Sequence, residues 1–171
     1  MLNIVVYCPE NAANMGNIIR IAYIFQAELF LIRPYGWIGN MRYFKNDACH
    51  FKNQELIRAT MGCIEKIKIH EYNSWEDFYR LIKDDPYNAI LFFSKNNAQG
   101  LQQYLKNNPQ LKNQNLFLVF GSETFGLTKL AEKINLSPRI MLEPVNVDKS
   151  HNLANAIAIC LYAISIHFNI A

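Results

Sequence analysis

The stretch LNIVVYCPENAANMGNIIRIAYIFQAELFLI (residues 2–32) predicts a strand, a helix and a second strand. The apolar runs Leu2–Tyr7 and Glu28–Ile32 are each followed by a turn that contains proline, as strands commonly are. Between them, apolar side chains recur at helical spacing over Met15–Gln26. A strand, a helix and a strand within about 30 residues form a parallel pair with a right-handed crossover. The stretch therefore indicates an α/β fold.

The rest of the chain continues this alternation. Two continuous apolar runs, Asn88–Ser94 and Asn115–Phe120, are typical of strands buried in a parallel sheet. Ser74 and Asp77 resemble a capping box and predict a helix start. The pattern predicts a single domain over residues 1–171, a parallel sheet with helices on both faces. The remaining expected elements are strands at Lys66–His70 (an edge) and Arg139–Leu142, two short helices within Trp37–Ile64, one within Asn96–Asn115, and helices at Ser74–Lys83, Thr128–Ile134 and Asn152–His167.

Composition excludes several classes of protein. With 51% hydrophobic and 18% charged residues, the chain is not expected to be disordered. Its longest apolar run, Ala156–Ile166, has about half the roughly 20 residues of a membrane span, and the N-terminus MLNIVVYCPE does not resemble a secretory signal. The scattered cysteines lack CxxC spacing, which predicts reduced thiols in a cytoplasmic protein without a metal site. The net charge of +3 permits RNA binding without arguing for it.

The helix expected at Asn152–His167 is apolar on almost every side. A helix of this kind has to be covered on every side. Because it lies at the end of the chain, a subunit interface is one natural cover.

Three polar, glycine-bearing loops follow expected strands, at the edge where parallel sheets bind ligands. The first, PENAANMGNIIR (residues 9–20), places Asn14, Gly16, Asn17 and Arg20 at a helix start, where free N–H groups suit a phosphate and a glycine allows close approach. The alternative is an N-capping Asn and a surface Arg20. The loop lacks the glycines of a Rossmann motif or a P-loop, so nucleotide binding of those kinds is not supported.

The second and third loops carry an acid, hydroxyls and amides. In LVFGSETFGL (residues 118–127), two glycines flank Glu123, which predicts a tight loop around a ligand or, alternatively, a turn with a solvated Glu123. In the third loop (residues 142–152), Ser150 or Asn152 could cap the last helix. His151 has no second ligand at metal-binding spacing, and the chain has no GxSxG nucleophile elbow. A metal site and a Ser–His hydrolase are therefore not expected.

Taken in order, the three loops resemble the motifs of the SpoU/TrmH-type RNA ribose 2′-O-methyltransferases of the SPOUT superfamily. The family patterns are N-x-G-x-x-x-R, then F-G-x-E-x-x-G-L after a strand, then a proline followed by S-x-N-x-[SA]. The opening residues are most similar to the TrmL group, which methylates the tRNA wobble nucleotide, whereas residues 53–69 resemble the larger ribosomal RNA methylases. The matching residues are Asn14, Gly16 and Arg20; Phe120, Gly121, Glu123, Gly126 and Leu127; and Pro144, Ser150, Asn152 and Ala154.

The resemblance implies a fold, a cofactor and a reaction. It implies a deep trefoil knot in the C-terminal part of the sheet, a homodimer that buries the last helix, and S-adenosylmethionine held by the knot loops. The reaction is methylation of an RNA ribose 2′-oxygen, on tRNA at the wobble position. Ribosomal RNA as substrate, a catalytically silent knotted RNA-binding protein, and a non-RNA nucleotide-binding module are alternatives. The implied cofactor-binding residues are Phe93, Ser94, Gly121, Glu123, Gly126, Met141, Leu142, Pro144, His151, Asn152 and Leu153.

The resemblance also implies roles in catalysis. Arg20 would bind the phosphate beside the target ribose with its guanidinium fork and stabilise the developing alkoxide. Asn14 and Glu123 would orient Arg20 and the ribose, while Ser150 and Asn152 would hold the loop on the cofactor side. Aromatic and cationic side chains alternate in the middle of the chain, which suits a splayed RNA nucleotide or, equally, an ordinary solvated surface. The expected RNA-binding residues are Arg20, Arg33, Arg42, Lys45 and Arg58.

Overall fold

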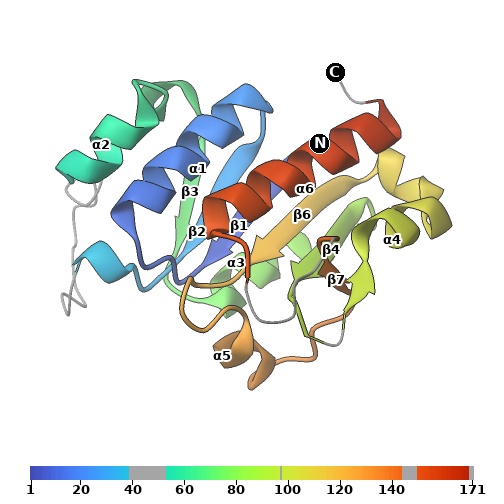
Figure 1. Cartoon of the computed structure of the whole chain (residues 1–171). Coiled ribbons are helices and arrows are strands. Elements are labelled where there is room, and N and C mark those ends of the chain that lie inside the picture. Colours follow the sequence, from blue (N-terminus) through green and yellow to red (C-terminus); the bar gives the residue numbers. More distant parts are fainter. Residues whose placement is uncertain (39–52, 97, 144–149, 170–171) are drawn as a thin grey trace.

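The computed structural model of the chain describes residues 1–38, 53–96, 98–143 and 150–169. Its described part is built on a seven-stranded parallel sheet in the order β3–β2–β1–β6–β4–β7–β5 (Figure 1). The predicted parallel α/β sheet is confirmed. The strands are β1 Leu2–Tyr7, β2 Glu28–Ile32, β3 Ile69–Tyr72, β4 Asn88–Phe93, β5 Gln99–Gly100, β6 Asn115–Phe120 and β7 Arg139–Met141.

The first strand–helix–strand unit forms as predicted. β1 pairs with β2 in parallel, from Asn3 opposite Glu28 to Tyr7 opposite Ile32. The helix between them, α1, spans Ala12–Ile24 and begins before the predicted Met15. The reason is the N-cap: the Asn11 side chain accepts the backbone N–H of Asn14 at 2.8 Å, so the helix starts at Ala12.

Helices cover both faces of the sheet, as predicted, and alternate residues of β1 divide the core between them. Ile4 and Val6 belong to the core under α1, α2, α4 and α6, whereas Val5 and Tyr7 belong to the core under α3 and α5 (Figure 1). The remaining helices are α2 Gln54–Thr60, α3 Trp75–Ile82, α4 Leu101–Asn107, α5 Thr128–Ala131 and α6 Leu153–Phe168. The carboxyl ends of β1 and β6 therefore emerge between two helical layers.

Several boundaries differ from prediction. The edge strand β3 lies at Ile69–Tyr72 and not at Lys66–His70, because a 3-10 helix occupies Ile64–Lys66. The rings of His70 and Tyr72 then stack on Phe30 of β2, at 4.6 Å and 6.3 Å between centroids. Ser74 caps α3 as predicted, with its hydroxyl accepting the N–H of Asp77.

The less regular parts of the chain also differ. The polar stretch Asn96–Asn115 contains β5, α4 and a 3-10 helix at Pro109–Asn113, and α5 is shorter than the predicted Thr128–Ile134. Within Trp37–Ile64, α2 is one of the two expected short helices. Residues 39–52 of that segment lie outside the described residues.

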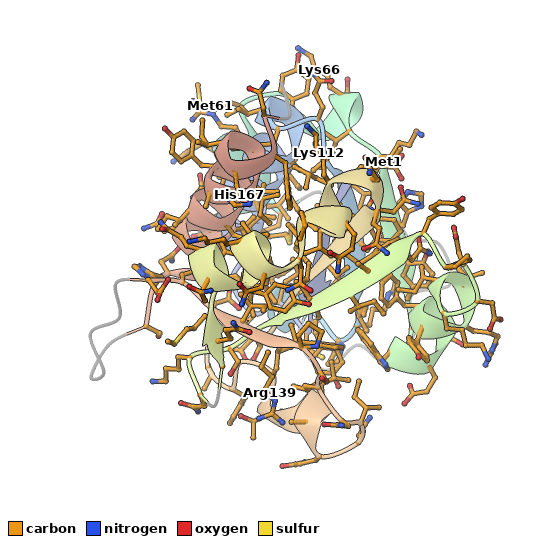
Figure 2. All side chains as sticks on the ribbon, turned by 90° about the vertical axis from the view of Figure 1, so that its right-hand side faces the viewer. Met1, Met61, Lys66, Lys112, Arg139 and His167 are labelled. Atoms are coloured by element: carbon orange, nitrogen blue, oxygen red, sulfur yellow. The ribbon has the colours of Figure 1, made fainter. Side chains whose placement is uncertain are left out.

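The last helix, α6, is only partly covered by its own chain. It packs against α1 and α4, and Figure 2 views the molecule from the side where α4 and the end of α6 lie. Three apolar side chains of α6 remain open to solvent: Ile159 (40% exposed), Tyr162 (63%) and Ile166 (65%). No helix in the described part of the chain has the length and hydropathy to cross a bilayer.

Candidate functional site

The three predicted loops meet through side chains of Asn14, Glu123 and Asn152. The Nδ2 of Asn14 donates to Oε1 of Glu123 at 3.1 Å, and the Nδ2 of Asn152 donates to Oδ1 of Asn14 at 2.9 Å. These residues are 109 and 138 positions apart in sequence. The fold thus joins the start of α1, the loop after β6 and the start of α6 into one polar network.

Glu123 also holds the backbone of the first loop. Its carboxylate accepts the N–H of Glu10 at 2.8 Å and the N–H of Asn11 at 3.2 Å. With the Asn14 amide, three N–H donors converge on this side chain. Among the described residues, the Glu123 carboxylate contacts the first-loop backbone and Asn14. It makes no contact there with Arg20, so a role in orienting Arg20 stays a prediction.

The second loop is tight, as the two glycines predicted. Ser122 and Gly126 exchange backbone hydrogen bonds of 3.1 Å and 2.9 Å, and the Ser122 hydroxyl accepts the N–H of Phe125 at 3.2 Å. Gly126 has φ of +55°, which disfavours any side chain there. At Gly121, a Cβ would lie 1.9 Å from the carbonyl carbon of Gly126. Both glycines are therefore needed to fold the loop back on itself.

Gly16 has a different role from the one predicted. It lies inside α1, where a Cβ would come within 2.4 Å of the Leu56 carbonyl oxygen and 2.6 Å of the Ala59 Cβ, both on α2. Gly16 therefore permits close packing of two helices and does not open a path to a phosphate. An Asn of this loop does cap the helix, as the alternative held, and it is Asn11.

Asn152 serves the third loop in two ways. Its Oδ1 caps α6 by accepting the N–H groups of Ala154 (3.0 Å) and Asn155 (3.4 Å), while its Nδ2 reaches Asn14. The capping alternative is thus confirmed, and the same side chain joins the polar network, while its role in cofactor binding stays a prediction. Ser150 and His151 lie exposed just before it, and Pro144 lies outside the described residues.

Arg20 stands apart from the polar network. It lies on the exposed side of α1, six residues after Asn14, and has no hydrogen-bond or ion-pair partner among the described residues. Six residues advance a helix by about 9 Å. The guanidinium is therefore exposed and available to a ligand.

The other predicted RNA-binding cations fall into three groups. Arg33 contacts the Glu71 carboxylate at 3.3 Å and lies over the ring of Tyr35, so part of its binding capacity is used within the protein. Arg58 is exposed on α2. Arg42 and Lys45 lie outside the described residues.

The predicted cofactor-binding segments lie at neighbouring strand ends. β6, β4 and β7 are consecutive in the sheet, which places Gly121, Ser94 and Leu142 just past three adjacent carboxyl ends. The Ser94 N–H donates to Ile140 at 2.9 Å, and Phe93 stacks on Phe120 at 4.6 Å. The sheet therefore offers a row of backbone groups beside the second loop.

Glu10 belongs to this region and was missed by sequence reasoning. Its carboxylate accepts the backbone N–H of Thr124 at 3.2 Å and also the Thr124 hydroxyl. The hydrogen bonds from Thr124 hold the pKa of Glu10 below its ordinary value. An acidic residue is evident in the first loop sequence CPEN (residues 8–11), but its partner Thr124 lies 114 positions later in the chain.

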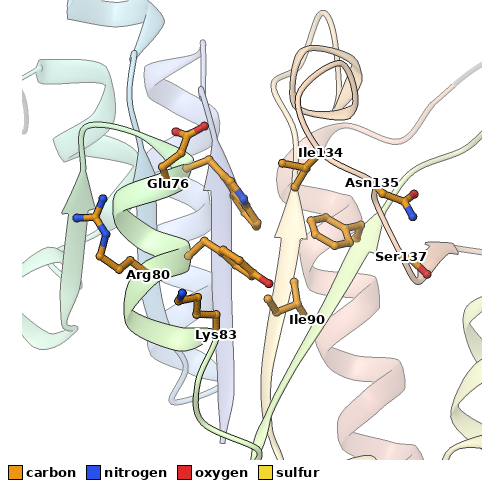
Figure 3. A pocket seen from close by; sticks show the side chains of 10 residues that line it. Glu76, Arg80, Lys83, Ile90, Ile134, Asn135 and Ser137 are labelled. Carbon is orange, nitrogen blue, oxygen red and sulfur yellow. The ribbon is translucent and has the colours of Figure 1, made fainter.

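A separate groove of about 490 Å³ lies on the α3 side of the sheet (Figure 3). Ile90 and Phe92 of β4 line it, between α3 and residues 134–137. Glu76, Arg80 and Lys83 of the α3 side are among its lining residues, so its charges are mixed, although the Arg80 guanidinium points away from the groove (Figure 3). None of the residues predicted to bind cofactor or RNA lines this groove.

Comparison with known proteins gives one concordant result. The model of the SpoU rRNA Methylase family matches residues 1–162. A Mycoplasma genitalium protein, provisionally named tRNA (cytidine(34)-2'-O)-methyltransferase, is 35% identical over 96% of this chain and 90% of its own length. The Burkholderia cenocepacia tRNA (cytidine(34)-2'-O)-methyltransferase is 27% identical over 95% and 92%.

Solved structures share the fold. A structure described as showing the 2-OH methylation of C/U34 on tRNA superposes with a TM-score of 0.77 over 99% of this chain and 97% of its own, at 23% identity. An AdoMet-bound rRNA methyltransferase from Sinorhizobium meliloti superposes with a TM-score of 0.72 at 20% identity, over 97% of this chain and 56% of its own.

Proposed function

The chain belongs to the SpoU rRNA Methylase family, and on that premise we propose that it is an S-adenosylmethionine-dependent tRNA ribose 2′-O-methyltransferase acting on the wobble nucleotide. The observation that carries the proposal is the Asn14–Glu123–Asn152 network, because it unites the three family motifs at one edge of the sheet. Such an enzyme would act in the cytoplasm.

The choice of tRNA over ribosomal RNA rests on the relatives. The likeness to proteins named for position 34 of tRNA extends over nearly the whole of both chains. By contrast, only 56% of the Sinorhizobium meliloti rRNA methyltransferase is matched. Ribosomal RNA remains the second candidate, favoured by the RATMG segment at residues 58–62.

The residues present fit S-adenosylmethionine. Three adjacent strand ends offer backbone N–H and C=O groups for an adenine. Related methyltransferase structures include one with AdoMet bound. In the proposed enzyme the second loop, residues 141–144 and residues 151–153 hold the cofactor, and the C-terminal segment is threaded as the family's trefoil knot.

In the proposed reaction the ribose 2′-oxygen forms a bond to the methyl carbon while the carbon–sulfur bond breaks. The cofactor supplies a sulfonium methyl group open to this attack. The guanidinium of Arg20, which has no partner in the described part of the chain, binds the neighbouring phosphate and stabilises negative charge growing on the 2′-oxygen. The hydroxyl proton passes to that phosphate or to water, since an arginine side chain rarely gives up its proton. Asn14, Glu123, Ser150 and Asn152 hold the surrounding loops.

The test is transfer of labelled methyl from S-adenosylmethionine to unmodified tRNA and, separately, to unmodified ribosomal RNA. Label on a ribose of tRNA at the wobble nucleotide is the expected result. Label in ribosomal RNA alone would move the assignment to the second candidate. Cofactor binding without any label would show a silent RNA-binding protein.

We also propose that the enzyme is a homodimer that covers the open face of α6. Ile159, Tyr162 and Ile166 lie on one side of that helix at spacings of three and four residues, and all three are exposed. Contiguous exposed apolar side chains are typical of protein interfaces.

Tyr162→Glu is expected to weaken dimerisation by about 100-fold or more, because it places an unpaired charge inside an apolar contact. Sedimentation equilibrium measures the dissociation constant. Leu81→Glu is the matched control, since Leu81 is similarly exposed (68%, against 63% for Tyr162) but lies on α3, on the other side of the sheet. A wild-type monomer, or a Tyr162→Glu variant that dimerises normally, would contradict the proposal.

A further inference from the structure

Glu10 lies in a reciprocal contact between the first and second loops. Its Oε2 accepts the N–H of Thr124 at 3.2 Å and the Thr124 hydroxyl. In return, the Glu123 carboxylate accepts the N–H groups of Glu10 at 2.8 Å and Asn11 at 3.2 Å. Each loop gives one carboxylate to the backbone of the other, and we call these four hydrogen bonds the carboxylate clasp.

The clasp overcomes an electrostatic cost. Two carboxylates in neighbouring loops repel each other, and donors from the opposite loop stabilise each of them. Hydrogen bonds to an ionised acceptor are about twice as strong as neutral ones. The hydrogen bonds to both carboxylates therefore form only when the two loops lie together. If either loop moves, each carboxylate loses its donors in the other loop.

The position of the clasp connects it to the site. Thr124 follows Glu123 directly, so whatever fixes Thr124 also fixes the residue that binds the Asn14 amide. Asn14 in turn binds Asn152 at the start of α6. Glu10 is thus linked to all three loops without belonging to any of the three motifs.

We propose that Glu10 is a positioning residue: by holding Thr124 it fixes the loop after β6 in the single conformation in which Glu123 meets Asn14 and the cofactor is bound. The reference to cofactor and methyl transfer rests on the proposed function, whereas the clasp itself does not. Glu10 acts through Thr124 and Glu123. Its loss is therefore expected to increase the mobility of the loop after β6, and any fall in the rate of methyl transfer follows from that change.

The test compares Glu10→Ala, Thr124→Val and the double variant with the wild type. Glu132→Ala is the matched control, because it removes an exposed carboxylate at the C-terminal end of α5, the helix that follows the second loop. Amide exchange by NMR reports the Glu123 half of the clasp at residue 10 and Asn11, without cofactor or RNA. Calorimetry then gives the affinity for S-adenosylmethionine per folded molecule, and methyl transfer gives kcat.

Glu10→Ala is expected to speed exchange of those two amides by about 10-fold and to weaken cofactor binding by about 5-fold, as loss of one or two charge-assisted hydrogen bonds implies. The double variant should be no worse than Glu10→Ala, because the residues act as one unit. A lower melting temperature with unchanged exchange and unchanged affinity would show a merely structural residue and overturn the proposal. If the wild type transfers no methyl group, the proposed function fails, and the exchange data still decide the clasp.

Discussion

Arg20→Ala is expected to lower methyl transfer to RNA by about 100-fold or more, the usual effect of removing a donor that stabilises developing negative charge. Arg20 is exposed on α1 and has no partner among the described residues, so its removal costs the fold little. The melting temperature and the affinity for S-adenosylmethionine should therefore stay near wild type. Single-turnover transfer of labelled methyl to tRNA measures the chemical step directly.

Two further variants sharpen this result. Arg20→Lys keeps the charge but loses the planar fork that binds a phosphate through two parallel hydrogen bonds, so it should recover only part of the rate. Asn17→Ala removes another exposed polar side chain one turn earlier on α1 and should stay within a few-fold of wild type. Activity of Arg20→Ala close to that of Asn17→Ala would remove Arg20 from the mechanism.

The fold was predictable where its signals are local. The apolar runs of β1, β2, β4 and β6 need no knowledge of their partners, because a strand buried on both faces is continuously apolar. The start of α1 was misplaced because Asn11 and Asn14 are both good caps, and only the fold shows that Asn14 is required by Glu123. β3 lies later than predicted because a 3-10 helix takes up Ile64–Lys66, and its register depends on pairing and ring stacking with Phe30 of the neighbouring strand β2.

The sequence identified most residues of the candidate site, but it did not predict how they contact each other. Asn14, Glu123 and Asn152 were identified from motif spacing, and they do meet. Gly16 was misread, since a glycine at a loop–helix junction serves a phosphate or a second helix equally well, and α2 decides between them. Glu10 could not be assigned because its hydroxyl and amide donors come from a residue 114 positions later. Pairings of that kind are fixed by the sheet order and not by local sequence.

Glu123→Gln is expected to lower both stability and activity although the two side chains have the same shape. Oε2 of Glu123 accepts from the Glu10 N–H, and Oε1 accepts from the Asn11 N–H and the Asn14 amide. An amide must turn its NH2 toward one of these sets, so at least one N–H donor faces another donor. Such a mismatch costs about 1–3 kcal/mol, and the half-exposed position favours the lower end.

For a chain of this length, that cost corresponds to a fall in melting temperature of about 3–6 °C. Methyl transfer should fall by about 5-fold to 15-fold, because the same free energy separates Asn14 from the loop after β6. Glu132→Gln is the control, since it removes one negative charge from an exposed side chain near the same loop. Differential scanning calorimetry and single-turnover transfer on the same samples separate the two effects. An unchanged melting temperature would mean that the carboxylate does not hold the loops together. A lower melting temperature with full activity per folded molecule would mean that Glu123 contributes to stability but not to methyl transfer.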